Sequence, residues 1–140
     1  MTTAAPLPSL DRIRQAAQLL GTELGAQLIV LFGSAAREPG ASADLDIGIL
    51  SRHPLEVVAV SNRLIQALGT QAIDVADLRR ADPLLLALVA RDGIPLYEAS
   101  PGAFAAFASL AVRRFADTRK FRDAERRGVQ DFIAGFGSGT

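Results

Sequence analysis

The chain has 140 residues, of which 49% are hydrophobic, and its acidic and basic residues balance to a formal net charge of zero. This length predicts one domain over residues 1–140, with a core at about residues 9–112. The absence of cysteine excludes disulfides and thiolate metal sites. No apolar run is long enough to cross a membrane, so we expect a cytoplasmic protein that does not bind membranes.

The first predicted elements are a helix, a buried strand and a tight turn. Ser9 is a suitable cap for a helix that ends at Gly21 or Gly25. The apolar run 28–32 predicts a strand, and Gly33-Ser34 predicts a sharp turn with outward N–H groups. Residues 35–37 continue as a short helix. Arg37 could there contact a phosphate or lie in solvent.

The next strand begins with two carboxylates. Nine residues separate Ser34 from the segment 44–50, in which Asp44 and Asp46 share one face. Two close carboxylates repel each other unless a cation lies between them, and Mg²⁺ prefers such oxygen ligands. The segment therefore suggests a metal and nucleotide site. The alternative is that Asp44 only opens the strand while Asp46 faces solvent.

A third strand could add another acid to this site. A turn at residues 51–54 leads into a helix that starts near Pro54 and ends at Gly69, and His53 lies too far along the chain for a catalytic role. The strand 71–78 follows. If it pairs with the segment 44–50, Asp74 joins Asp44 and Asp46; a salt bridge from Asp74 to an arginine is the alternative. Asp77 is expected on the other face or at the frayed strand end.

The last elements are two helices around a short strand. Asp82-Pro83 begins a helix that ends at Gly93, and Pro95 places the strand 94–97 at a sheet edge, with Tyr97 half-buried. A long helix starts at Ser100-Pro101. These elements predict an α/β (α+β) fold with a small mixed sheet of about four strands, packed by helices and followed by this long C-terminal helix.

The C-terminal tail, residues 113–140, is mildly basic. It holds seven basic and four acidic residues, against eight and eleven in residues 1–112, which is too weak a bias for strong nucleic-acid binding. Its apolar residues need another surface to be buried, so docking on a partner and a solvated tail both remain open. These residues are Phe121, Phe132, Ile133 and Phe136.

The spacing of Gly33-Ser34, Asp44-x-Asp46 and the later Asp74 resembles the signature of the DNA polymerase beta-like nucleotidyltransferase superfamily. The segments 31–37, 73–78 and 93–98 resemble its minimal nucleotidyltransferase (MNT) branch, the MntA-type antitoxins that pair with HEPN toxins. The resemblance covers about residues 10–120. One departure is Arg37-Glu38, where the family commonly has Arg-Gly.

The resemblance implies a catalytic centre with two Mg²⁺ ions and ATP as substrate. Gly33 and Ser34 would hold the triphosphate, with Arg37 near it, while Asp44, Asp46 and Asp74 would bind metal. Asp74 would also help to activate the acceptor hydroxyl. Two cations at such a site would stabilise the attacking oxygen and the departing pyrophosphate, and no nucleophilic side chain is needed.

The resemblance also implies transfer of AMP to a protein hydroxyl, a tyrosine of a cognate HEPN toxin, with this chain as the antitoxin. Two alternatives remain open. A small-molecule nucleotidyltransferase of the antibiotic-modifying type would use a homodimer to build its acceptor pocket. A non-catalytic antitoxin would neutralise its partner by occlusion.

Overall fold

Four strands form one mixed sheet in the computed structural model, which describes residues 7–38 and 44–118. Across the sheet the order is β3 (Ile73–Asp77), β2 (Leu45–Leu50), β1 (Leu28–Phe32) and β4 (Ile94–Glu98). Strand β1 is antiparallel to both β2 and β4, whereas β2 and β3 are parallel. The predicted mixed sheet is confirmed, and β4 is an edge strand as Pro95 indicated.

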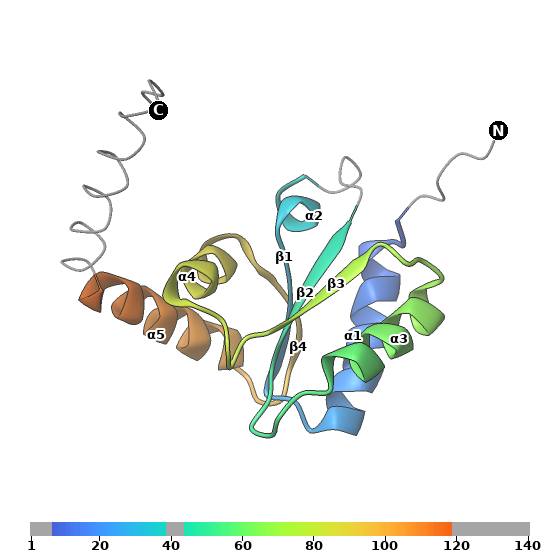
Figure 1. The fold of residues 1–140 in the computed structure, drawn as a ribbon, viewed down its shortest axis with the longest axis horizontal. Coiled ribbons are helices and arrows are strands. Elements are labelled where there is room, and N and C mark those ends of the chain that lie inside the picture. Colours follow the sequence, from blue (N-terminus) through green and yellow to red (C-terminus); the bar gives the residue numbers. More distant parts are fainter. Residues whose placement is uncertain (1–6, 39–43, 119–140) are drawn as a thin grey trace, which may run out of the picture.

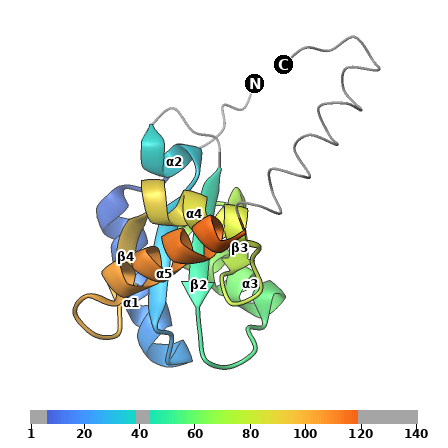
Figure 2. The same ribbon diagram turned by 90° about the vertical axis from the view of Figure 1, so that its left-hand side faces the viewer.

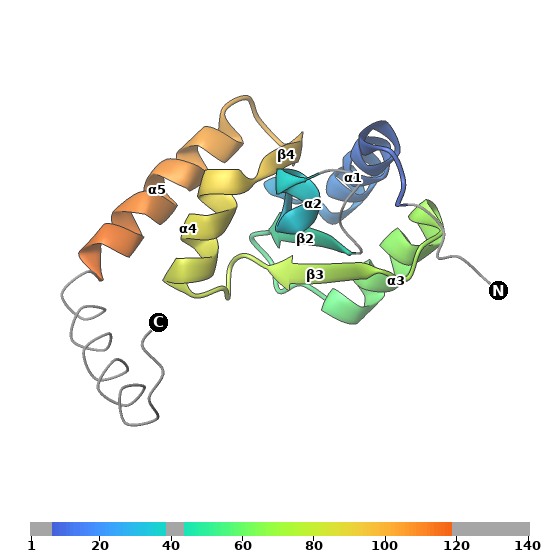
Figure 3. The same cartoon turned by 90° about the horizontal axis from the view of Figure 1, so that it is seen from above.

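Two pairs of helices cover the two faces of this sheet. Helices α1 (Leu10–Leu24) and α3 (Val57–Leu68) lie on one face, and α4 (Pro83–Asp92) and α5 (Ala103–Asp117) lie on the other (Figure 1). The view from above shows the sheet between the two pairs (Figure 3). Because successive strand side chains point to opposite faces, each face has its own buried cluster. The short helix α2 (Ser34–Arg37) lies at one end of the sheet.

Local sequence signals determine several helix ends. The Ser9 hydroxyl accepts a hydrogen bond from the Arg12 N–H (3.2 Å), and the Asp82 carboxylate accepts one from the Leu85 N–H (2.8 Å). Gly25 and Gly69 end α1 and α3 with φ of 62° and 69°, a conformation that favours glycine. These caps confirm the predicted starts of α1 and α4 and the predicted end of α3.

Two helices begin two or three residues later than predicted. Helix α3 starts at Val57 instead of near Pro54. The Ser51 hydroxyl accepts a hydrogen bond from the His53 N–H (3.3 Å) in the preceding turn, and residues 54–56 then belong to no helix or strand. Helix α5 starts at Ala103. The Glu98 carboxylate, which belongs to the preceding strand, caps its first turn by accepting a hydrogen bond from the Phe104 N–H (2.9 Å).

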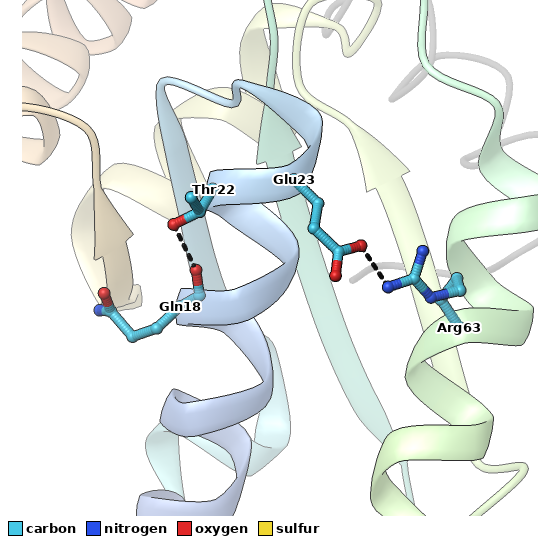
Figure 4. A network of polar contacts seen from close by, with 4 residues as sticks. All are labelled: Gln18, Thr22, Glu23 and Arg63. Atoms are coloured by element: carbon cyan, nitrogen blue, oxygen red, sulfur yellow. Dashed lines mark hydrogen bonds and ion pairs between the residues drawn. The ribbon is translucent and has the colours of Figure 1, made fainter.

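Helices α1 and α3 also contact each other directly (Figure 4). Arg63 of α3 forms an ion pair with Glu23 of α1, and about half of each side chain is exposed. Exposed ion pairs contribute at most about 1 kcal/mol, so apolar packing, for example of Ile13 and Val60, holds the pair together. In the same view the Thr22 hydroxyl donates to the Gln18 carbonyl (2.9 Å) within α1.

The two outer helices, α4 and α5, pack on each other as well as on the sheet (Figure 2). The residues predicted to need a covering surface, Phe121, Phe132, Ile133 and Phe136, lie outside the described residues. The part of the chain that is described contains no helix both long and apolar enough to cross a membrane.

We expect the Asp82→Ala substitution to lower the free energy of unfolding by about 1 kcal/mol, because the Leu85 N–H at the start of α4 loses its acceptor. Chemical denaturation monitored by circular dichroism measures this change. Asp82→Ser is the control, since serine also caps helices and should retain most of the stability. Equal losses in both variants would contradict a capping role.

Candidate active site

The register of β2 and β3 places two carboxylates side by side. Asp46 of β2 is the pairing partner of Asp74 of β3, and paired residues of neighbouring strands project from the same face. Helices α4 and α5 pack on the same face of the sheet, beyond the two carboxylates. The structure thus confirms that β3 pairs with the acidic strand and brings Asp74 to Asp46.

Asp44 completes the acidic group. It is exposed and immediately precedes β2, two residues before Asp46. The pKa of Asp46 is raised, first by its partial burial and then by the negative charges of Asp74 and Asp44. Both carboxylates therefore lie near enough to act on Asp46. A cation between them would remove this repulsion.

Gly33 lies directly against Asp46. Phe32 pairs with Asp46 across β1 and β2, so the chain leaves β1 beside this carboxylate. A Cβ atom at position 33 would overlap the Asp46 Oδ2 atom. Gly33 also has φ 73° and ψ −156°, a backbone region that only glycine occupies readily. The turn can therefore approach the carboxylate only because residue 33 has no side chain.

Helix α2 follows this turn and ends in Arg37. The Gly33 carbonyl accepts hydrogen bonds from the Ala36 and Arg37 N–H groups (3.2 Å each), which fixes the helix against the end of β1. The Glu38 N–H donates to the Ser34 carbonyl (2.8 Å), so the departure at position 38 continues the turn of α2. Ser34 and Arg37 are exposed.

Arg37 has an acidic neighbour that the sequence did not reveal. The pKa of Asp92, at the end of α4, is lowered chiefly by its hydrogen bond to Arg91 and, to a smaller extent, by the charge of Arg37. The Arg91–Asp92 ion pair has an N–O distance of 2.7 Å. Only the packing of the sheet brings the ends of α2 and α4 together, so no local pattern could have indicated this neighbour.

The donor set suits a hard cation such as Mg²⁺. Asp44, Asp46 and Asp74 offer carboxylate oxygens, which are the ligands that Mg²⁺ prefers. Burial is the main cause of the raised pKa of Asp46, and the negative charges of Asp74 and Asp44, which add to it, are the part that a cation would offset. Within residues 7–38 and 44–118, no group of three or more Asp, Glu, His or Cys side chains is placed so that it could hold a metal ion. Such a site would be completed by substrate phosphates, as is usual for Mg²⁺. Metal binding stays a prediction.

The other candidate residues lie elsewhere. His53 follows the opposite end of β2, and Asp77 pairs with Ile49 on the other face, where its carboxylate accepts from the Arg79 N–H (3.1 Å). Tyr97 is half-buried on the edge strand β4, as predicted. No ion pair involves Asp74 among the described residues; the Arg79 guanidinium instead donates to the Arg52 carbonyl (2.8 Å).

Known proteins are similar to this chain in sequence and in fold. The family described as "Polymerase beta, Nucleotidyltransferase" matches residues 15–102. The protein adenylyltransferase MntA of Aphanizomenon flos-aquae (strain 2012/KM1/D3) is 24% identical, with 94% of this chain and 97% of that protein covered.

Two solved structures are similar over most of the chain. The first is of a tri-AMPylated Shewanella oneidensis HEPN toxin in complex with its MNT antitoxin (25% identity, TM-score 0.60, covering 86% of this chain and 98% of that one). The second is of a toxin–antitoxin complex with AMP-PNP (24% identity, TM-score 0.67, covering 90% and 98%).

We expect Gly33→Ala to lower the free energy of unfolding by at least about 2 kcal/mol, because alanine is strained at this φ and ψ and its Cβ displaces the Asp46 carboxylate. Gly25→Ala is the matched control: its φ is also positive, but no atom lies within 4 Å of the added Cβ, so about 1 kcal/mol should be lost. Urea denaturation measures both. Equal losses would show that Asp46 does not restrict residue 33.

We expect Asp74→Asn to lower the pKa of Asp46, since a neighbouring negative charge is removed, and Asp44→Asn to lower it by less. Carboxyl carbon chemical shifts followed against pH by NMR, without divalent cations, measure the pKa. Asp77→Asn is the control and should leave it unchanged, because its carboxylate lies on the other face. An unchanged Asp46 pKa in the Asp74 variant would show that the charge of Asp74 does not act on Asp46.

Proposed function

This chain belongs to the polymerase beta nucleotidyltransferase family, and we propose that it transfers AMP from ATP to a hydroxyl of a partner protein, a tyrosine of a cognate HEPN toxin. It would thereby act as an antitoxin. The observation that carries the proposal is the pairing of Asp46 with Asp74, next to Asp44 and Gly33, at one end of the sheet.

The acceptor class comes from similar proteins. The MntA relative is a protein adenylyltransferase and aligns over nearly the whole of both chains. A second similar chain comes from a complex with a tri-AMPylated HEPN toxin, and a third from a toxin–antitoxin complex with AMP-PNP. These likenesses support AMP as the transferred group and a HEPN protein as the partner.

The nucleotide would bind beside Gly33. The turn at Gly33 directs the chain into α2, so the backbone around Ser34 adjoins the Asp46 carboxylate, where a triphosphate would meet the metal ligands. Arg37 ends α2 and would add positive charge for the phosphates, while Asp92 limits that charge from the α4 side. Glu38 also lies next to Arg37, which is expected to weaken phosphate binding relative to the family's usual glycine.

The reaction is an in-line displacement at the α-phosphorus of ATP. The tyrosine oxygen forms a bond to phosphorus, the bond to the β-phosphate oxygen breaks, and pyrophosphate leaves with that electron pair. Asp74, which is exposed on β3, would accept the hydroxyl proton, while Asp44 and Asp46 would hold Mg²⁺ together with it. Bound Mg²⁺ supplies positive charge to the phosphate oxygens.

We expect labelled ATP, incubated with Mg²⁺ and the cognate HEPN-type protein, to place AMP on a tyrosine of that protein. Asp44→Asn, Asp46→Asn and Asp74→Asn should each slow the transfer by roughly 100-fold or more, because each removes a ligand charge from the site. Phosphorimaging and peptide mass spectrometry measure the product. EDTA should abolish the reaction, and restored Mg²⁺ should recover it.

The control for these variants is Asp77→Asn, which changes an acid on the same strand but on the opposite face. It should retain transfer, because asparagine keeps the oxygen that accepts from the Arg79 N–H. Label on small molecules alone would favour an antibiotic-type enzyme. Neutralisation of the toxin that survives Asp44→Asn and Asp46→Asn would favour occlusion, and either result would contradict the proposal.

A further inference from the structure

The outer edge of β3 is open beside the proposed catalytic acid. Strand β3 is the last strand on its side of the sheet (Figure 3). Its bonds to β2 run through alternate residues: the Ala72 carbonyl accepts from Leu45 (2.8 Å), and the Leu78 N–H donates to Ile49 (3.0 Å). Because consecutive residues of a strand direct their backbone groups to opposite sides, Ile73 and Val75 direct theirs away from the sheet.

These outward groups have no hydrogen-bond partner within the part of the chain that the structure describes. Among the described residues, an outward backbone group of β3 is bonded only at the far end of the strand, where the Asp77 carbonyl accepts from the Arg80 N–H (3.1 Å). The open stretch therefore contains Ile73 and Val75, with Asp74 between them. It coincides with the acidic site.

The opposite edge of the sheet is protected. In β4, Pro95 has no N–H to offer to another strand, and the Leu96 carbonyl accepts a hydrogen bond from the Gln18 side chain (2.7 Å). Gln18 lies on α1, which packs beside β4 (Figure 4). Exposed edges are normally protected in such ways because they pair with other chains. The described residues provide no comparable protection for β3 between Ile73 and Val75.

We propose that the acceptor segment of the partner protein binds as an added strand on β3, with its tyrosine paired to Asp74. This inference rests on the proposed function and specifies how that site receives its substrate. Directly opposed residues on neighbouring strands have Cβ atoms about 5 Å apart on the same face. The pairing would therefore hold the tyrosine beside the carboxylate that accepts its proton.

The same register specifies the chemistry of the segment. The residues on either side of the tyrosine would project from the other face, next to Ile73 and Val75, which are half-buried apolar residues at the edge. We expect these two neighbours to be apolar, because they would cover the exposed remainder of Ile73 and Val75. On the catalytic face the small side chain of Ala76 leaves room beside the tyrosine.

Amide hydrogen exchange, read by NMR on the intact chain with and without its cognate HEPN-type protein, tests the docking directly. In the free chain the Ile73 and Val75 amides should exchange fast, and the complex should slow them by about tenfold or more, because each gains a hydrogen bond or is covered. The Asp74 and Ala76 amides, which face β2, are internal controls. Unchanged exchange at Ile73 and Val75 in a formed complex would overturn the proposal.

Val75→Pro tests the role of this edge in the reaction. Proline removes an outward N–H and leaves the bonds to β2 intact, so transfer to the partner should fall by about tenfold or more through a raised KM. Val75→Thr keeps the N–H and is the matched control. Binding of ATP with Mg²⁺, measured by calorimetry, and the melting temperature should be retained in both variants.

A test on the acceptor leaves this chain unchanged. In synthetic peptides that carry the acceptor tyrosine, N-methylation at alternate residues should block modification where the N–H faces β3 and permit it at the intervening residues. Equal effects at all positions would overturn the docking. If AMP is transferred but the Ile73 and Val75 amides are not protected, the proposed function stands and the docking on β3 is wrong. If these amides are protected but no AMP is transferred, the docking stands and the proposed function is wrong.

Discussion

Repulsion between carboxylates on two neighbouring strands is the constraint on which the site depends. Asp46 and Asp74 are paired on one face, and the isolated chain must hold these like charges together. Apolar burial on the opposite face of β2 holds the two carboxylates in place, since Leu45 and Ile47 alternate with Asp46 and are fully buried. A shift of the strand register by one residue would expose these apolar side chains. Their burial therefore fixes the register and keeps Asp46 beside Asp74 despite the repulsion between the two carboxylates.

Local patterns in the sequence were sufficient for much of this arrangement. The alternation around Asp46 indicates a strand with its acids on one side, and the caps at Ser9 and Asp82 mark helix starts that the structure confirms. The pairing of Asp74 with Asp46 was a conditional expectation, because it required β2 and β3 to be neighbours, and the parallel connection through α3 provides this.

Other features depend on contacts between distant segments. The capping of α5 by Glu98 and the approach of Arg37 to Asp92 each join residues whose local sequence carries no signal of the other. The overlap between a Cβ at Gly33 and Asp46 follows from the β1–β2 register and could not be derived from the Gly-Ser turn alone. Sequence periodicity specifies which face a residue occupies, but tertiary packing specifies what it meets.

If the acceptor is a protein, as we propose, the topology would let so small a domain accept it. The described elements that carry the proposed nucleotide site, the β1–α2 turn and the start of β2, lie on one side of Asp74, while the free edge of β3 lies on its other side. A donor and an acceptor can therefore approach the same carboxylates from opposite directions. Under this arrangement the partner supplies the wall of the site that a larger nucleotidyltransferase would build from its own chain, so recognition of the acceptor and completion of the site become one event.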